Sequence, residues 1–258
     1  MKRPLLTACL LLAAAVGAAQ EYDKDEALAT SQAAIGTRLE DYRLRDIDGQ
    51  AFDLARLRGR PLVVSMIYTS CHHVCPMITR NLVDIVNVAR EALGDEAFSV
   101  VTIGFDWKVD SPQRMRQFAK QQGAADIAEW HFLAGDAATV DALSRNLGFL
   151  FFPSAKGFDH LTQTTVVDRN GIIYRQIYGV DLEIPALVEP LKELVFDTPR
   201  SAGLIEHWVS TFKLFCTVYD PNSNRYRFDY SILMTITVGL LCLGAIATFI
   251  VSEWRNAK

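Results

Sequence analysis

The sequence predicts an α/β fold, in which a mixed β-sheet is flanked by helices and followed by a single C-terminal transmembrane helix. Three observations lead to this expectation. Short apolar runs alternate with amphipathic stretches through the middle of the chain, a hairpin signal follows them, and an uncharged apolar run extends from Ser231 to Ser252. Alternation of this kind is typical of strand–helix–strand units built on parallel strands.

The composition indicates a globular domain with additional apolar segments. The chain has 258 residues, of which 50% are hydrophobic and 22% charged, a balance that excludes a mainly disordered chain. Two apolar runs, Leu5–Ala19 and Ser231–Ser252, do not belong in a soluble core, and setting them aside leaves about one domain. The formal net charge of −4 argues against a nucleic-acid partner, which would require a basic surface.

The N-terminal run is typical of a secretory signal peptide. It follows Lys2 and Arg3 and ends in small residues just before the polar Gln20. As a helix it would reach only about 22 Å, which is short of a hydrocarbon core of about 30 Å. We therefore expect residues 1–19 to be a signal peptide that is removed after export, and residues 20–34 to be a linker.

The C-terminal run predicts a transmembrane helix at residues 230–252. It carries no charged residue, and Tyr230 and Trp254 flank it at the depth of the membrane interfaces. We expect residues 253–258 to form a cytoplasmic tail. Together with a cleaved signal peptide, this topology describes a single-pass protein of the inner membrane whose globular domain lies in the periplasm.

The middle of the chain alternates between strand and helix patterns. Leu62–Tyr68 is a continuous apolar run, typical of a buried strand, and Pro76 stands where the first turn of a helix accepts a residue without an N–H group. Further strands are expected at Phe98–Phe105 and Trp130–Leu133, and helices at Pro76–Gly94, from Ser111 to Gly123, at Ala137–Leu147 and at Ile184–Val195.

A hairpin is expected before the last helix. Thr164–Val167 and Ile172–Tyr178 alternate around a turn containing Asn170 and Gly171, for which we expect the positive φ values of a tight turn. Parallel strands need crossover helices, whereas a hairpin is antiparallel. The combined pattern therefore predicts a thioredoxin-like arrangement over residues 35–197.

Two cysteines stand where this arrangement places reactive groups. Cys71 and Cys75 occur between the first core strand and its helix, where backbone N–H groups stabilise a thiolate. Positions i and i+4 of a helix have β-carbons about 5–6 Å apart, which allows a shared metal ion and, after a small adjustment, a disulfide. The spacing favours chelation over the C-x-x-C pattern of dithiol exchange. Cys9 and Cys242 lie inside the apolar runs.

Three motifs of this chain resemble those of the Sco/SenC family, copper-binding proteins that assist assembly of the binuclear copper centre of cytochrome c oxidase. The resemblance covers Ile35–Val195 and rests on YTSCHHVCP, GFDWKVDSP and FDHLTQTTVVDRNG. In that family two cysteines and one histidine bind copper, and these map to Cys71, Cys75 and His160. The resemblance implies copper as the cofactor and the copper-receiving subunit of the oxidase as a partner, with another copper donor protein as a further one.

The donor types agree with this implication. Two thiolates are soft ligands suited to Cu(I), and an added imidazole gives a three-coordinate site that can also hold Cu(II). Asp159 is a candidate to orient the imidazole of His160. Family members commonly carry Pro-Asp where this chain has His72 and His73. These two residues could raise the affinity for Cu(II), act as transient transfer ligands or face water, and we expect them to face water.

The residues before the predicted membrane helix form an amphipathic juxtamembrane segment, 198–229. It contains Cys216, for which three roles stay open: a buried small residue, a redox partner of the copper cysteines, or a partner contact. We favour the first and assign Cys216 no function. His131 and His207 are expected to be structural.

The resulting hypothesis is a membrane-tethered copper chaperone that transfers copper by ligand exchange. The alternative is a thiol:disulfide oxidoreductase that uses Cys71 and Cys75 to reduce the cysteines of the oxidase subunit before metallation. Enzymes of that kind generally carry a cis-proline just before the hairpin, but residues 157–165 contain no proline. A peroxidase of related fold fits less well, because the cysteine motif differs from the single-cysteine pattern of such enzymes.

Overall fold

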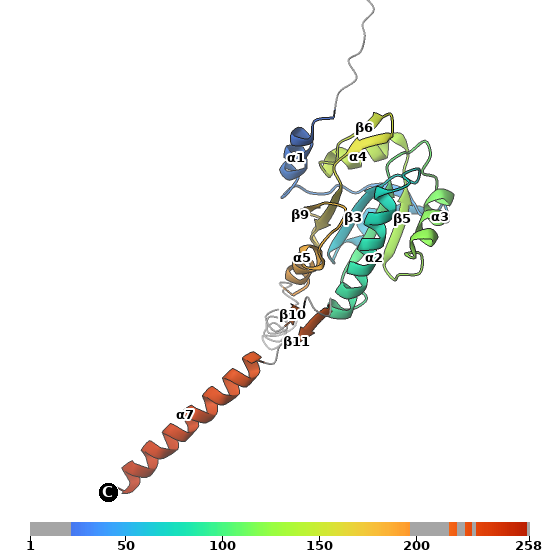
Figure 1. Ribbon diagram of the computed structural model, residues 1–258. Coiled ribbons are helices and arrows are strands. Elements are labelled where there is room, and N and C mark those ends of the chain that lie inside the picture. The colour runs from blue at the N-terminus through green and yellow to red at the C-terminus, as the bar shows by residue number, and fades with distance from the viewer. Residues whose placement is uncertain (1–21, 197–216, 221–224, 229–230, 257–258) are drawn as a thin grey trace, which may run out of the picture.

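The computed structural model describes residues 22–196, 217–220, 225–228 and 231–256 (Figure 1). Its centre is a seven-stranded sheet with the strand order β2-β1-β5-β4-β3-β8-β9. The strands of this sheet are β1 (Arg43–Arg45), β2 (Ala51–Asp53), β3 (Leu62–Ile67), β4 (Ser99–Gly104), β5 (Trp130–Ala134), β8 (Gln163–Val167) and β9 (Ile173–Tyr178).

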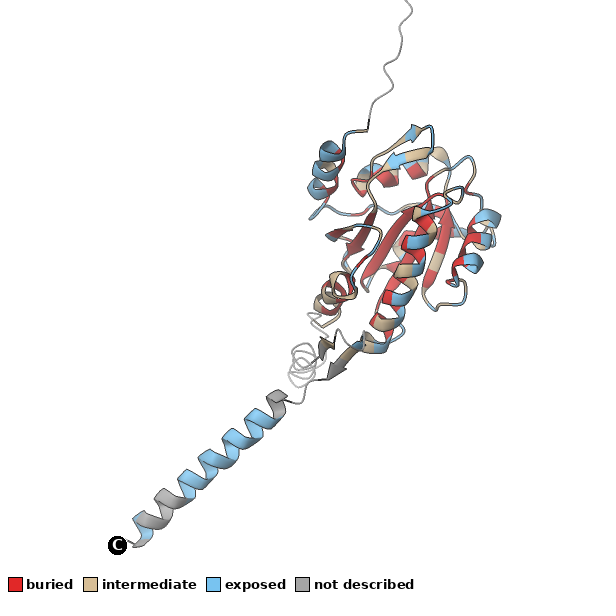
Figure 2. Cartoon of the chain, viewed as in Figure 1, coloured by how far each residue is buried: buried red, intermediate tan, exposed pale blue. Residues whose placement is uncertain are grey.

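The three central strands are parallel, as the strand–helix alternation predicts. β3 pairs with β4, and β4 with β5, in parallel register, whereas β8 and β9 are antiparallel to their neighbours. Every residue of β3 and β4 is buried, which is typical of parallel strands covered on both faces. The buried residues gather on this sheet and on the inward faces of the helices (Figure 2). The mixed α/β sheet flanked by helices is thus confirmed.

Four helices lie close to their predicted positions. α3 begins after Ser111, whose hydroxyl caps it, and ends at Gly123 in the left-handed conformation. α2 buries one face, including Leu82 and Val86, and its first turn contains Cys75. In Figure 1, α2 crosses in front of β3 and lies beside α5. The four helices are α2 (Val74–Leu93), α3 (Pro112–Gln122), α4 (Ala137–Asn146) and α5 (Ile184–Phe196).

The structure also contains elements that the sequence patterns did not reveal. Helix α1 (Lys24–Ala33) lies within the expected linker, and the Ser31 hydroxyl fixes it through Gln163 (2.7 Å) and Tyr178 (2.8 Å). A short antiparallel pair, β6 (Phe151–Ser154) and β7 (Gly157–His160), precedes β8 and ends at His160. A 3-10 helix, η1 (Leu54–Leu57), follows β2.

The turn between β8 and β9 differs from the expectation in one residue. Gly171 has a φ of +86°, but Asn170 is not among the described residues with positive φ. The Gly171 N–H donates to the Asp168 carbonyl (3.0 Å), and the Asp168 N–H donates to the Ile172 carbonyl (2.8 Å). A turn closed in this way needs only one left-handed residue. The prediction for Asn170 is therefore wrong, and the hairpin itself is confirmed.

The C-terminal region contains a second two-stranded antiparallel sheet and a long helix. β10 (Thr217–Asp220) pairs with β11 (Arg225–Phe228) inside the predicted juxtamembrane segment, and α7 (Ser231–Asn256) follows. Within the described part of the chain, no helix has both the length and the apolarity needed to cross a membrane. The transmembrane helix at 230–252 therefore stays a prediction. The signal peptide, His207 and Cys216 lie outside the described residues.

Candidate metal centre

A buried carboxylate holds the loop that carries the first cysteine. Asp110 is only 1% exposed. Its Oδ1 accepts hydrogen bonds from the N–H (2.8 Å) and the hydroxyl (2.7 Å) of Thr69, and its Oδ2 accepts one from the Asp106 N–H (2.9 Å). Asp110 thereby ties the loop after β4 to the loop after β3. This contact gives the GFDWKVDSP motif a physical role that the sequence analysis did not identify.

The two cysteines converge as their spacing predicts. Cys71 lies in the loop and is partly exposed, whereas Cys75 lies in the first turn of α2 and is fully buried. The Cys75 N–H donates to the Cys71 Sγ at 3.4 Å, and both side chains are free thiols. Of the pair, therefore, Cys71 is the one that solvent can reach.

The two sulfurs have opposite pKa shifts. A hydrogen bond from the Cys75 thiol, helped by the N–H groups of Cys75 and His73 and by the Tyr68 hydroxyl, lowers the pKa of Cys71 to about 4. The same thiol–thiolate hydrogen bond, together with burial, raises the pKa of Cys75. Near neutral pH the site thus holds one thiolate and one thiol. A soft metal ion that binds both sulfurs would displace the remaining proton.

His160 is held in a defined tautomer at the end of β7. Its Nδ1 lies 2.8 Å from the Leu161 carbonyl oxygen, so Nδ1 carries the proton and donates it, and Nε2 presents a lone pair. Burial lowers the pKa of His160, which keeps the ring neutral. A neutral imidazole with one nitrogen fixed by a carbonyl is the form that binds metals. The Leu161 carbonyl, and not the exposed Asp159, orients this ring.

Aromatic rings surround the imidazole. The ring centroids of Phe105 and Phe149 each lie 5.3 Å from that of His160, and that of Tyr68 lies 6.2 Å away. The Tyr68 hydroxyl also lies close enough to Cys71 to lower the pKa of that thiol as a hydrogen-bond donor, so one side chain acts on both the cysteine and the histidine. Burial raises the pKa of Tyr68 to about 12, which keeps this donor protonated. Tyr68 is an aromatic residue at a strand end, and nothing in the local sequence marks it for this role.

The three predicted ligands are only partly assembled. In the described residues, no group of three or more His, Cys, Asp or Glu side chains is arranged to hold a metal ion. Cys71 and Cys75 are in contact, whereas His160 is connected to Cys71 through Tyr68 and lies close enough for the thiolate to affect its pKa. The donor types nevertheless suit copper, because sulfur and neutral imidazole are ligands that this metal prefers.

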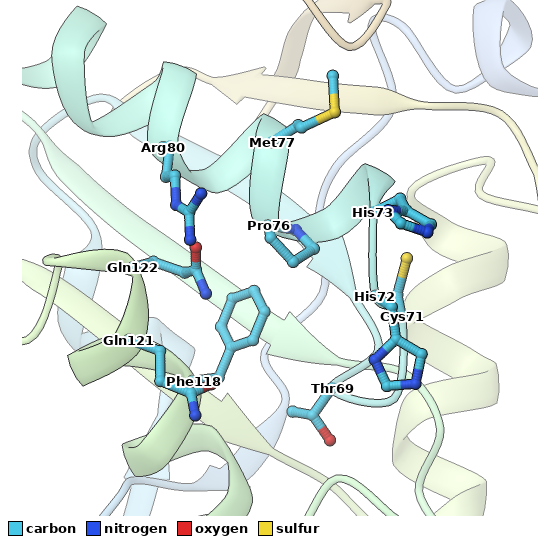
Figure 3. Close-up of a pocket in the computed structure, with 10 residues that line it drawn as sticks. All are labelled: Thr69, Cys71, His72, His73, Pro76, Met77, Arg80, Phe118, Gln121 and Gln122. Atoms are coloured by element: carbon cyan, nitrogen blue, oxygen red, sulfur yellow. The ribbon is translucent and has the colours of Figure 1, made fainter.

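A pocket opens beside Cys71, between the first turns of α2 and the C-terminal end of α3 (Figure 3). Its volume is about 570 Å³. His72 and His73 line it and are exposed, as expected for them. The remaining lining residues are Thr69, Pro76, Met77, Arg80, Phe118, Gln121 and Gln122.

His131 lies away from this pocket and packs on Phe52, with ring centroids 4.8 Å apart, which fits the structural role expected for it.

Solved structures share this fold. The crystal structure of a protein from Aquifex aeolicus has a TM-score of 0.57 and 28% identity, over 66% of this chain and 99% of that one. Bradyrhizobium japonicum ScoI with copper bound has a TM-score of 0.51 and 19% identity, over 61% of this chain and 99% of ScoI. BsSco, described as a member of the Sco family of cytochrome c oxidase assembly proteins with a disulfide switch, has a TM-score of 0.55 and 17% identity, over 62% and 94%.

Sequence comparison agrees with the structural one. A SCO2-like protein of Rickettsia typhi is 24% identical over 161 residues, which are 59% of this chain and 75% of that protein. The model of the SCO1/SenC family matches residues 30–195, a region that contains both cysteines, the Asp110 contact and His160. The match spans more than half of the chain and nearly the whole of the sheet domain, and on this ground the chain belongs to the SCO1/SenC family.

Proposed function

We propose that this chain is a membrane-tethered copper chaperone that helps to assemble the binuclear copper centre of cytochrome c oxidase. Copper is bound by Cys71, Cys75 and His160 and passes by ligand exchange to the copper-receiving subunit of the oxidase. The observation that carries this proposal is the pairing of a Cys71 thiolate with a Cys75 thiol, close to an imidazole whose Nε2 presents its lone pair. The fold shared with a copper-bound ScoI and with BsSco adds support.

The three residues divide the binding chemistry. The Cys71 thiolate attracts the ion, and Cys75 becomes a second sulfur ligand when its thiol proton passes to solvent. Sulfur donors alone can hold Cu(I), and the nitrogen of His160 extends the set to one that can also hold Cu(II). The aromatic rings of Phe105 and Phe149 limit water around the imidazole.

The proposed tether is α7, with the sheet domain in the periplasm. At 1.5 Å per residue the uncharged part of this helix, Ser231–Ser252, extends about 33 Å, against a hydrocarbon core of about 30 Å. Its described apolar side chains, including Met234 and Leu241, are exposed. Tethering donor and acceptor to one membrane raises their effective concentration without new contacts. Extraction of the full chain by alkaline carbonate, which removes peripheral proteins only, would contradict the tether.

Metal titration of the full chain in detergent tests the binding site. We expect about one copper per chain with sulfur ligands in X-ray absorption spectra, and no tight binding by a Cys71→Ser/Cys75→Ser double variant. His160→Ala should weaken Cu(II) more than Cu(I), because the two sulfurs still hold the reduced ion. A wild-type chain that binds copper no better than the double variant would contradict the proposal. Turnover of a protein disulfide by the metal-free chain, unaffected by His160→Ala, would favour the oxidoreductase instead.

A further inference from the structure

We propose that His73 and Met77, together with the thiolate of Cys71, form an outer docking site for Cu(I), where the ion is held before it reaches Cys75. The inference rests on the proposed function and adds the route by which copper enters and leaves the thiol pair. Of the three residues of this outer site, only Cys71 is also one of the three copper ligands proposed above.

His73 and Met77 lie one helical turn apart at the start of α2. The Met77 N–H donates to the His73 carbonyl at 3.2 Å, so the two residues share one face of the helix. Residues spaced in this way have β-carbons about 5–6 Å apart, a span that one metal ion can bridge. The imidazole of His73 is exposed, and Met77 is 55% exposed, so solvent reaches both side chains.

Both residues line the pocket beside Cys71. Figure 3 draws the Cys71 sulfur and the imidazoles of His72 and His73 at one end of this pocket, with Met77 on the adjoining turn of α2. Cys75 is fully buried and is not among the residues that line this pocket. An ion that approaches from solvent therefore meets these exposed side chains and Cys71 before it meets Cys75.

The ligand atoms of His73 and Met77 suit a transient binding site for Cu(I). A thioether and an imidazole are weaker ligands for this ion than a thiolate, so they can capture copper and release it again. Figure 3 draws the Met77 side chain directed away from Cys71, and with three rotatable bonds and 55% of its surface exposed this side chain can turn its sulfur toward the pocket. His73 stands two residues from Cys71 in the chain, and both residues line the same pocket.

The transfer is a ligand exchange without a change in oxidation state. The incoming Cu(I) forms bonds to the Cys71 sulfur, the His73 nitrogen and the Met77 sulfur as its bond to the donor breaks. The Cys75 thiol then releases its proton to solvent and forms a Cu–S bond, while the bonds to His73 and Met77 break. Delivery to the acceptor follows the same steps in reverse.

Loading kinetics of the full chain in detergent test the route. Cu(I) is supplied as its bicinchoninate complex, and loss of the colour of that complex reports transfer in a stopped-flow instrument. We expect a His73→Ala/Met77→Leu variant to load about tenfold more slowly, which corresponds to about 1.4 kcal/mol of barrier, with its final affinity unchanged within about twofold. Gln121→Ala, which alters the same pocket without removing a soft ligand, is the matched control and should load at the wild-type rate.

A second measurement detects the outer site itself. A Cys75→Ser/His160→Ala variant lacks two of the three proposed inner ligands but keeps Cys71, His73 and Met77. It should still bind one Ag(I), a redox-inert analogue of Cu(I), and lose this binding when His73 and Met77 are also replaced. Tight copper in the wild type with equal loading rates in all variants would overturn the outer site alone. Absence of tight copper in the wild type would overturn the proposed function and the outer site with it.

Discussion

Cys71 and Cys75 differ in exposure and acidity although only three residues separate them. Cys71 is reached by solvent and its pKa is lowered to about 4, because the Cys75 thiol, two backbone N–H groups and the Tyr68 hydroxyl donate to it. Cys75 is fully buried and its pKa is raised. The pair is therefore an asymmetric one, in which the outer sulfur reacts first and the inner sulfur retains its proton.

This asymmetry predicts a flat pH profile for alkylation of Cys71 in the metal-free chain. Because the pKa is lowered, the thiolate persists as the pH falls and is lost only near pH 4. Between pH 6 and 9 the rate with iodoacetamide should change less than about twofold, whereas an ordinary thiol of pKa about 8.5 slows roughly tenfold per unit below its pKa. Peptide mass spectrometry should find Cys75 unmodified until the protein unfolds. Equal modification of both cysteines would contradict the asymmetry.

A second prediction concerns Asp110, whose two carboxylate oxygens accept three hydrogen bonds. Asn at this position can accept through one oxygen only and leaves a buried donor unpaired. We expect Asp110→Asn to lower the free energy of unfolding by about 1–3 kcal/mol in urea denaturation. Asp106→Asn, which keeps the backbone N–H that binds Asp110, is the control and should change stability by less than about 0.5 kcal/mol. An equal loss in both variants would contradict this role.

At the scale of elements, the β6–β7 hairpin positions both His160 and Tyr68. Gly157, at the start of β7, has a φ of +117°, and a β-carbon there would lie 2.8 Å from the Tyr68 hydroxyl. Tyr68 in turn donates to Cys71 and packs on His160. The hairpin therefore limits where the Tyr68 ring can lie, and through it the environment of the thiolate.

Gly157→Ala should consequently raise the pKa of Cys71. The added methyl group displaces the Tyr68 hydroxyl and removes one donor that lowers the pKa of the thiol. Thiolate absorbance near 240 nm, followed against pH in a Cys75→Ser background, measures the shift. Gly179→Ala is a close control, because Gly179 has a φ of +116° and a β-carbon there meets nothing within 4 Å. It shares the backbone strain without the contact, so its Cys71 pKa should not move.

Local signals explain which elements the sequence could predict. Helix α3 begins and ends at its two capping residues, Ser111 and Gly123. The continuous apolar run of β3 likewise predicts a strand that is buried on both faces. Helix α1 depends instead on bonds from Ser31 to residues more than 130 positions away. Asp23 caps this helix and its first turn is acidic, which are local signals of a helix start, but the helix has only a weak apolar face to indicate packing. The sequence therefore does not reveal that this segment packs on the domain, and the expectation of a linker is wrong for residues 24–33.

The same distinction holds for the site. The spacing of Cys71 and Cys75 is a local property of one helix turn, and it predicted their contact. The bond from Thr69 to Asp110 joins residues 41 positions apart, and Tyr68 reaches His160 only through the packing of β7. Exposure of His72 and His73 could be predicted from their loop position, whereas their place on the pocket rim required the structure.

At the scale of the whole molecule, β11 fastens the C-terminal region to the sheet domain. The Tyr226 hydroxyl donates to Glu189 of α5 at 2.8 Å, and Arg225 lies 3.7 Å from Glu91 near the end of α2. Burial and the bond to Glu189 raise the pKa of Tyr226, so the hydroxyl stays a donor at any physiological pH. The hairpin is therefore joined to both of the neighbouring helices.

Tyr226→Phe should loosen this attachment. It removes one hydrogen bond, with an expected cost of about 1 kcal/mol, and leaves the ring in place. Hydrogen exchange followed by mass spectrometry should show faster exchange in β11 and in α5 around Glu189. Identical exchange in wild type and Tyr226→Phe would show that this bond does not fasten β11.

Helix α2 connects the two ends of the domain as a rigid rod. Cys75 stands in its first turn and Glu91, the partner of Arg225, in its last, a separation of about 24 Å at 1.5 Å per residue. With the hairpin as pivot, a tilt of the domain by about 20° would sweep the sulfurs through about 8 Å. In the tethered copper donor proposed above, small tilts of the domain would therefore move the two sulfurs across an area of a neighbouring protein while the fold of the domain stays unchanged.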